Sequence, residues 1–253
     1  MTTLSPNDSG SNRKLKEIQE LAARTDSDLN GEFGRILKAS GGVLFLGKNY
    51  AKTSRLLLGL NPGSMSDPEN GSDRPEEEDS FCVKLFPHNP WETLHKKYAY
   101  WRNCCFFVNA VRSLRDWFES ATVAFCVPWR TPGKVELLKL DRQMNGRLSA
   151  CSGMLFHKML EHHRMDCDSN GPVLILAGKA SLTWIASPSF LNFDWPQYTV
   201  GKSHGESSYQ WRKLVFRDIT IYQVPHFSRA NSHKRLEQCA RWLASELGLA
   251  IFG

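Results

Sequence analysis

Four short apolar runs divide the chain, and each ends in a polar or glycine-containing turn. They lie at residues 55–60, 121–127, 172–178 and 219–224. Runs of this length bounded by turn residues are typical of buried β-strands, and stretches with helical periodicity lie between them. Strands that alternate with helices predict a parallel sheet covered on both faces. We therefore predict an α/β fold, a three-layer α/β/α sandwich around a central, mostly parallel four-stranded sheet.

Helical periodicity predicts where the covering layers come from. Helices are expected at residues 14–24, about 29–38, 91–98, 108–118 and 148–162, from Lys179 onward, and at the end of the chain, where Leu236, Cys239, Ala240, Leu243 and Leu247 share one face. Residues 1–12 are rich in Ser, Asn and Gly and are predicted to be disordered. Residues 187–213 are predicted to form a long loop or hairpin. No repeat or internal boundary is visible, so we expect one domain over residues 13–253.

Composition narrows the class of protein only modestly. A hydrophobic content of 41% and a charged content of 23% are typical of an ordinary globular domain. The net charge of +6 favours a polyanionic partner, although many soluble proteins are mildly basic. No apolar run approaches the roughly 20 residues that a membrane span needs. We expect no membrane association, and a monomer.

The cysteines argue against a disulfide framework and against a metal site. There are seven, an odd number, and none form a C-x-x-C pair. This pattern does not fit a zinc ribbon or an iron–sulfur cluster, so no metal or cofactor is expected. The first residues contain no apolar signal region. Reduced thiols then indicate a cytoplasmic, nucleoid-associated protein, or a nuclear one in a eukaryote.

Two of the predicted strands end in residues that carry chemistry. The first runs into Asn61-Pro62-Gly63, and the last runs into Pro225-His226-Phe227-Ser228-Arg229. Open α/β sheets bind ligands just outside the carboxyl ends of their strands. Either segment alone reads as an ordinary turn. Together they predict a site that offers Asn, His, Ser and Arg.

These segments resemble motifs of the uracil-DNA glycosylase superfamily. Gly59-Leu60-Asn61-Pro62-Gly63 matches the G-x-N-P-G motif of its mismatch-specific and single-strand-selective branches. Leu176-Ala177-Gly178-Lys179-Ala180 resembles the L-G-K-x-A signature on the third strand, and 226–229 resembles a variant of the second motif, H-P-S-P or N-P-S-G. Residues 86–90 resemble the segment that supplies an aromatic platform. The resemblance covers roughly residues 50–250, with the motifs in the family's order.

The resemblance implies hydrolysis of the bond between a base and its sugar. Asn61 would orient a water below C1′, and His226 would donate a hydrogen bond to the oxygen of the departing base. An amide is no real base, so positioning and electrostatics would carry the rate. Without the first motif, a capping or core histidine would be the preferred interpretation of His226.

The resemblance also implies two groups of contacts. Those to the flipped base would come from Gly59, Gly63, Phe86 and Phe125. Those to DNA would come from Ser228, Arg229, Arg130 and Lys179. Ser228 would bind a flanking phosphate with help from backbone N–H groups, and Arg229 or Phe227 would fill the gap left by the flipped nucleotide. From residue type alone, a core role is preferred for Phe86, a surface arginine is an equal interpretation of Arg130, and Lys179 reads as an exposed lysine.

Three departures from the family pattern bear on specificity. Relatives that excise uracil usually carry an asparagine near the end of the second strand, where 125–128 here reads Phe-Cys-Val-Pro. Strict uracil enzymes carry a tyrosine at the position of Gly63, and glycine leaves room for a C5 substituent. Phe227 replaces the usual proline of the second motif.

Three hypotheses follow for the function of the chain. The first is a monofunctional DNA glycosylase that removes a damaged, mismatched or 5-modified pyrimidine, in repair or in defence against modified foreign DNA. The second is a non-catalytic member of the same fold that binds a flipped base in duplex or single-stranded DNA. The third, an unrelated nucleotide-processing enzyme, is disfavoured because the chain has no Walker or G-x-G-x-x-G motif.

Overall fold

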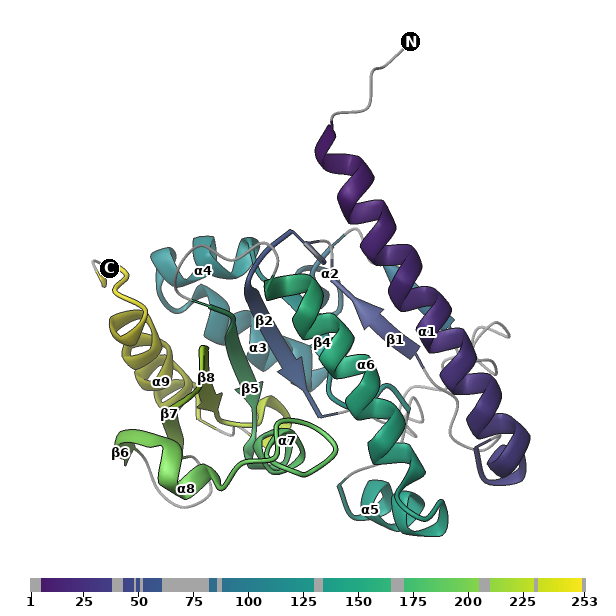
Figure 1. Cartoon of the computed structure of the whole chain (residues 1–253). Helices are drawn as coiled ribbons and strands as arrows, with labels where there is room; N and C mark the ends of the chain where they lie inside the picture. The colour runs from purple at the N-terminus through teal and green to yellow at the C-terminus, as the bar shows by residue number, and fades with distance from the viewer. Residues whose placement is uncertain are drawn as a thin grey trace.

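A six-stranded sheet lies at the centre of the protein (Figure 1). The computed structural model describes residues 6–37, 43–47, 49–50, 52–60, 82–85, 88–129, 134–164, 171–204, 210–229 and 232–251. The sheet has the order β4-β2-β5-β8-β7-β6. Its strands are β2 (Arg55–Gly59), β4 (Thr122–Phe125), β5 (Val173–Ala177), β6 (Thr199–His204), β7 (Trp211–Phe216) and β8 (Ile219–Val224).

The predicted α/β class is confirmed, and the predicted number of strands is wrong. Strands β4, β2, β5 and β8 are the four expected ones, and they run parallel to one another. Strands β7 and β6 extend the sheet in antiparallel pairing beyond β8. Only Arg217 and Asp218 separate β7 from β8, and Arg217 has a positive φ of 56°, as a tight hairpin turn requires. The second half of the segment predicted as a loop or hairpin therefore belongs to the sheet.

A separate pair of parallel strands lies beside β4. It consists of β1 (Val43–Leu46) and β3 (Cys82–Leu85), neither of which we predicted. After β1, the N–H of Gly47 donates to the carbonyl of Val123 over 3.0 Å. A Cβ at Gly47 would lie 2.6 Å from the Val123 nitrogen, so the close approach of the two chains requires glycine there.

Two helical layers cover the two faces of the sheet, as Figure 1 shows. On one face lie α1 (Pro6–Leu37), α5 (Lys134–Gln143), α6 (Arg147–Arg164), α7 (Lys179–Ile185) and α8 (Trp195–Tyr198). On the other lie α2 (Pro90–Thr93), α3 (Ala99–Asn109), α4 (Arg112–Glu119) and α9 (His233–Glu246), with the short 3-10 helix η2 (Phe227–Arg229) ahead of α9. Each layer encloses its own hydrophobic core.

Helix α1 differs from what the sequence led us to expect. It begins at Pro6, so residues 6–12, predicted to be disordered, are helical. The element consists of two helices joined at a kink, with non-helical geometry at Phe33 (φ −126°, ψ 17°), so the division into two helices is confirmed and the kink lies further along the chain than predicted. Packing against α6 adds tertiary contacts that local composition does not reveal.

A buried polar network joins α1 to α6. His162 of α6 exposes 1% of its surface. Its Nδ1 lies 2.8 Å from the Tyr50 hydroxyl, and its Nε2 lies 3.1 Å from a Glu17 carboxylate oxygen. The Lys14 ammonium donates to the His162 carbonyl over 3.1 Å. The chain before the first strand is therefore bound to the domain by specific hydrogen bonds.

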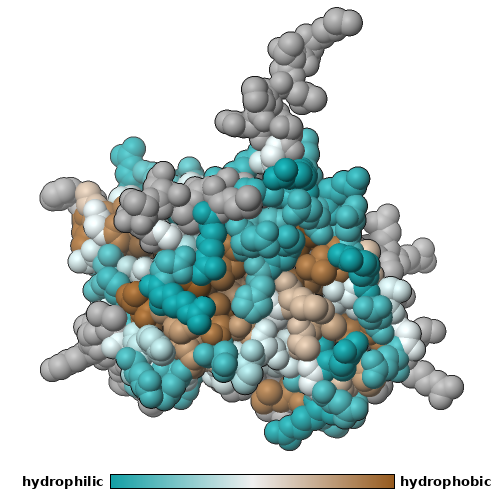
Figure 2. Space-filling model, in the orientation of Figure 1, coloured by the Kyte–Doolittle hydropathy of each residue, from teal (hydrophilic) through white to brown (hydrophobic). Residues whose placement is uncertain are grey.

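The outer surface of this face is mostly polar. Figure 2 shows hydrophilic side chains along the region of α1 and α6, with smaller hydrophobic areas among them. Within the described ranges, no helix has both the length and the apolar character to cross a membrane.

Candidate functional site

The carboxyl ends of β2, β4, β5 and β8 meet at one edge of the sheet because these strands are parallel. The pairing of β2 with β4 continues past both strands: Cys126 N–H donates to the Gly59 carbonyl, and Val127 N–H to the Leu60 carbonyl, both over 2.9 Å. Leu60 is thus held at this edge, directly before Asn61. The predicted site residues Asn61, Gly63, Phe86 and Arg130 lie outside the described residues.

Gly59 and Phe125 face each other across this edge. They are register partners of β2 and β4. A Cβ at Gly59 would lie 2.7 Å from Cε1 of Phe125, so the phenyl ring covers the space that a side chain would take. Phe125 exposes only 7% of its surface. The structure therefore brings together two of the residues predicted to contact the base.

Tyr100, which sequence reasoning missed, links this pair to the end of β8. It belongs to the first turn of α3, and its hydroxyl lies 3.4 Å from the position of a Gly59 Cβ. Its ring centroid lies 5.4 Å from that of His226, at an interplanar angle of 64°. Burial, reinforced by the nearby thiols of Cys104 and Cys126, raises the pKa of Tyr100 well above its usual value. The hydroxyl therefore stays protonated and is available as a hydrogen-bond donor.

His226 and Ser228 are hydrogen-bonded to each other just after β8. The Ser228 Oγ lies 2.7 Å from Nδ1 of His226. If the hydroxyl donates, Nδ1 is the acceptor and Nε2 carries the proton of a neutral imidazole. Because Nδ1 is engaged, a hydrogen bond from His226 to a ligand must come from Nε2.

Gly178 allows His226 to lie against the end of β5. It has a φ of +91°, and its N–H donates to the Val224 carbonyl over 2.8 Å. A Cβ at Gly178 would lie 2.9 Å from the Cβ of His226. Position 178 therefore requires glycine for two reasons: its φ is positive, and His226 lies where a side chain would begin.

Phe227 is fully buried, which corrects one expectation. It packs against Tyr100 and Phe107, each with ring centroids 5.4 Å from its own, and the Asn103 amide donates to its carbonyl over 2.7 Å. A side chain held in this way is an anchor of the loop and is wrongly predicted to fill the gap left by a flipped nucleotide. Arg229, the last residue of η2, is then the residue predicted to fill the gap. The structure does not describe its side chain.

Lys179 follows Gly178 at the start of α7 and is exposed. Its ammonium lies 5.9 Å from the ring centroid of Trp195 in α8. It lies at the same edge of the sheet as His226. Helix α7, which it begins, covers the opposite face of the sheet from α3 and Tyr100. Its predicted contact with DNA stays a prediction.

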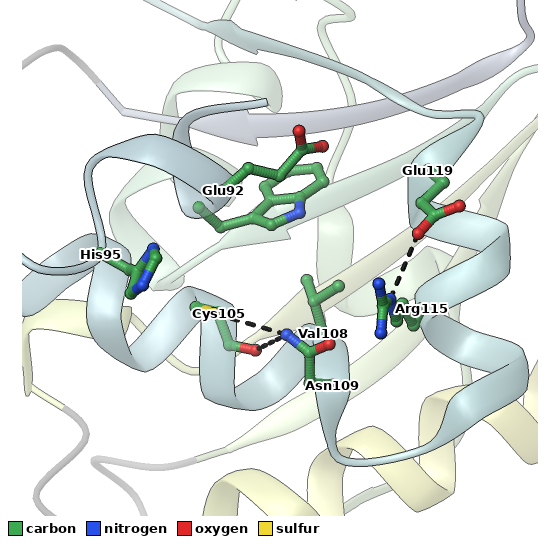
Figure 3. Close-up of a pocket in the computed structure, with 8 residues that line it drawn as sticks. Glu92, His95, Cys105, Val108, Asn109, Arg115 and Glu119 are labelled. Carbon is green, nitrogen blue, oxygen red and sulfur yellow. Dashed lines mark hydrogen bonds and ion pairs between the residues drawn. The ribbon is translucent and has the colours of Figure 1, made fainter. Parts of the chain in front are cut away.

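A cavity of about 440 Å³ lies elsewhere, among α2, α3 and α4 (Figure 3). It is lined by Trp91, Glu92, His95, Cys105, Val108, Asn109, Arg115 and Glu119. Three of its polar side chains already have partners: the Asn109 amide donates to the Cys105 carbonyl over 2.7 Å, and Arg115 pairs with Glu119 over 3.2 Å. The predicted site residues that the structure describes do not line it, so the cavity is separate from the candidate site.

Within the ranges that the structure describes, no group of three or more His, Cys, Asp and Glu side chains is placed to hold a metal ion. The chain matches neither a known protein-family model nor a curated protein.

Proposed function

We propose that this protein is a monofunctional DNA glycosylase that hydrolyses the bond between deoxyribose and a damaged, mismatched or 5-modified pyrimidine. One observation carries the proposal. Tyr100 contacts the region of Gly59 with its hydroxyl and the imidazole of His226 with its ring, so the end of β2, where Asn61 follows, and the end of β8 lie around one side chain. Gly59 of the first motif and His226 of the second thereby lie around the same side chain.

His226 acts on the leaving group in this proposal. The oxygen of a water oriented by Asn61 bonds to C1′ as the glycosidic bond breaks, and the bonding pair leaves on the base. The Nε2–H of His226 stabilises the negative charge that develops on the oxygen of the base, and the proton lost by the water goes to solvent. Ser228 keeps the imidazole in the tautomer that can donate.

The surroundings of Gly59 are aromatic and apolar. Phe125 and Tyr100 border this position, and Cys126, next in the chain, is buried. No amide occurs at 125–128 to read the edge of uracil, and Gly63 offers no side chain that would exclude a C5 substituent. We therefore favour thymine or a 5-modified pyrimidine over strict uracil specificity.

A non-catalytic protein that binds a flipped base is the second candidate. The absence of an amide at residues 125–128 favours it, because the base would then be held without the contact that uracil enzymes use. The retention of both Asn61 and His226 favours the enzyme.

The decisive experiment incubates the protein with duplexes and single strands that carry a panel of modified and mismatched pyrimidines. Alkaline cleavage then reveals abasic sites, and the panel identifies the base. Product with any member supports the glycosylase. Binding to a modified strand without product from any member supports the binding protein.

A further inference from the structure

Two cations meet on one indole ring close to the candidate site. Cζ of Arg212, in β7, lies 4.7 Å from the ring centroid of Trp195, and Nζ of Lys179 lies 5.9 Å from the same centroid. We call these three residues the Trp195 cluster. Lys179 is exposed and Trp195 is half-buried, so these two members of the cluster are accessible from solvent, whereas Arg212 is buried. Sequence reasoning found Lys179 alone.

Arg212 is a buried charge that no carboxylate in the described part of the chain neutralises. It exposes 6% of its surface, its Nη2 donates to Oε1 of Gln210, and its Nε makes no hydrogen bond to any described residue. Burial lowers its pKa by removing hydration from the charged form. A guanidinium is rarely buried without an anion, because desolvation is costly. A bound anion would compensate this charge.

The Trp195 cluster lies on the same sheet edge as His226. Arg212 is the register partner of Gln223 in β8, three residues before His226. Lys179 directly follows Gly178, which contacts His226. The side-chain oxygen of Gln223 is also buried without a hydrogen bond to the described residues, so unsatisfied polar groups gather on this side. An anion at Arg212 would lie at the same edge of the sheet as His226.

We propose that Arg212 and Lys179 form a phosphate-binding subsite for the backbone of the nucleic-acid strand whose flipped nucleotide reaches His226. This rests on the proposed function. A guanidinium supplies directed donors and an ammonium supplies a point charge, a combination suited to a phosphate oxygen. The half-buried face of Trp195 supplies an aromatic surface on which the next base can stack. The subsite would hold the strand on the side away from η2 and Arg229.

The first test is the salt dependence of binding to a labelled DNA duplex, measured by fluorescence anisotropy. Lys179→Gln and Arg212→Gln should each weaken binding about tenfold at moderate salt, and each should reduce the slope of log affinity against log salt by about one. Lys16→Gln, an exposed lysine on α1, serves as the matched control and should change neither quantity. Unchanged affinity and slope in Lys179→Gln would overturn the proposal without any concern about folding.

The second test uses inorganic phosphate as a probe and thermal unfolding as the readout. Phosphate should raise the melting temperature of the wild-type protein above that in chloride at equal ionic strength, and Arg212→Gln should abolish this difference. Arg212→Met should melt no lower than the wild type in phosphate-free buffer, because it removes an uncompensated charge. A much lower melting temperature of Arg212→Met, together with no effect of phosphate on the wild type, would show that Arg212 is a structural residue. That result would overturn the subsite.

The outcomes separate the subsite from the enzyme. Phosphate protection that depends on Arg212, with an unchanged salt slope for DNA, would assign the subsite to a free anion and overturn its role on a strand. A reduced slope in the variants without base release from any duplex would support the subsite and reject the glycosylase. If the wild type releases a base and the Lys179 and Arg212 variants bind DNA as tightly as it does, the subsite is rejected and the glycosylase is supported.

Discussion

The hydroxyl of Ser228 lies 2.7 Å from Nδ1 of His226, and this hydrogen bond changes the role expected for the serine. A hydroxyl has one hydrogen and cannot donate it to an imidazole and to a phosphate at the same time. If the hydrogen went to a phosphate, Nδ1 would have to carry a proton of its own, and a neutral His226 would lose the Nε2 proton that the proposed reaction needs. The geometry favours Ser228 as the residue that orients His226.

Ser228→Ala should therefore lower kcat more than it weakens DNA binding. The variant removes the hydrogen-bond partner of Nδ1 and lets the imidazole change tautomer. We expect a loss of about tenfold in single-turnover rate, in the range of one lost hydrogen bond. Direct binding of DNA to the same variant is the control. A weakened affinity at full rate would return Ser228 to phosphate binding.

Asn61→Ala and His226→Ala should each reduce base release by about 10²- to 10³-fold, because both act on charge and geometry present mainly in the transition state. Single-turnover assays at saturating enzyme measure the loss. Affinity for an uncleaved duplex should stay close to that of the wild type. Normal turnover in either variant would contradict the role assigned to that residue.

Gly178→Ala should reduce both stability and activity. The φ of +91° costs a side chain about 1–2 kcal/mol, and the new Cβ would displace His226. Gly146→Ala is the matched control, since Gly146 also has a positive φ, of 77°, and no described atom within 4 Å of its Cβ position. Both variants should melt earlier in thermal unfolding. Only Gly178→Ala should also lose activity, and equal activity in the two would show that the contact with His226 does not matter.

Gly63→Tyr should suppress activity on 5-substituted pyrimidines more than on uracil. A tyrosine would occupy the space beside C5 that glycine leaves open, as the family resemblance implies. Rates on thymine and uracil opposite the same base give the comparison. An equal loss on both substrates would mean that the glycine serves the backbone of the turn.

The protein should lose stability as the pH falls below about 6.5 because of His162. Burial lowers the pKa of His162 in the folded protein below its ordinary value of 6.5. The unfolded chain therefore binds more protons between the folded and unfolded pKa values, and the free energy of unfolding decreases as the pH falls through that window.

Thermal unfolding at several pH values measures this effect. His162→Gln should flatten the decrease below pH 6.5, since glutamine can bond to Tyr50 and Glu17 without titrating. His157→Gln, at an exposed histidine of the same helix, should keep the wild-type profile. A profile that is the same in all three proteins would place the acid sensitivity elsewhere.

The parallel half of the fold could be predicted because its strands are short, mostly apolar and bounded by turns. The positions of His226 and Ser228 at a strand end followed from the same pattern. Tyr100 could not be found in this way. Helix α3 contains several aromatic residues, and its sequence does not show which ring faces the ends of β2 and β8. Arg212 was missed because burial of a charge depends on which helix covers its strand. Strands β1 and β3 pair with each other across a long stretch of chain, and their short runs carry no signal of that partner.

The position of β5 has a consequence for how the protein folds. This strand pairs with β2 on one side and with β8 on the other, and Arg55 stands opposite Val173 in the first of these pairings. Neither partner is a neighbour in the chain, so loops of considerable length must close before the central strand has any support. The edge that carries His226 cannot exist in a partly synthesised chain that lacks β8. We expect slow folding, and fragments that end before residue 224 should have neither the sheet nor the site.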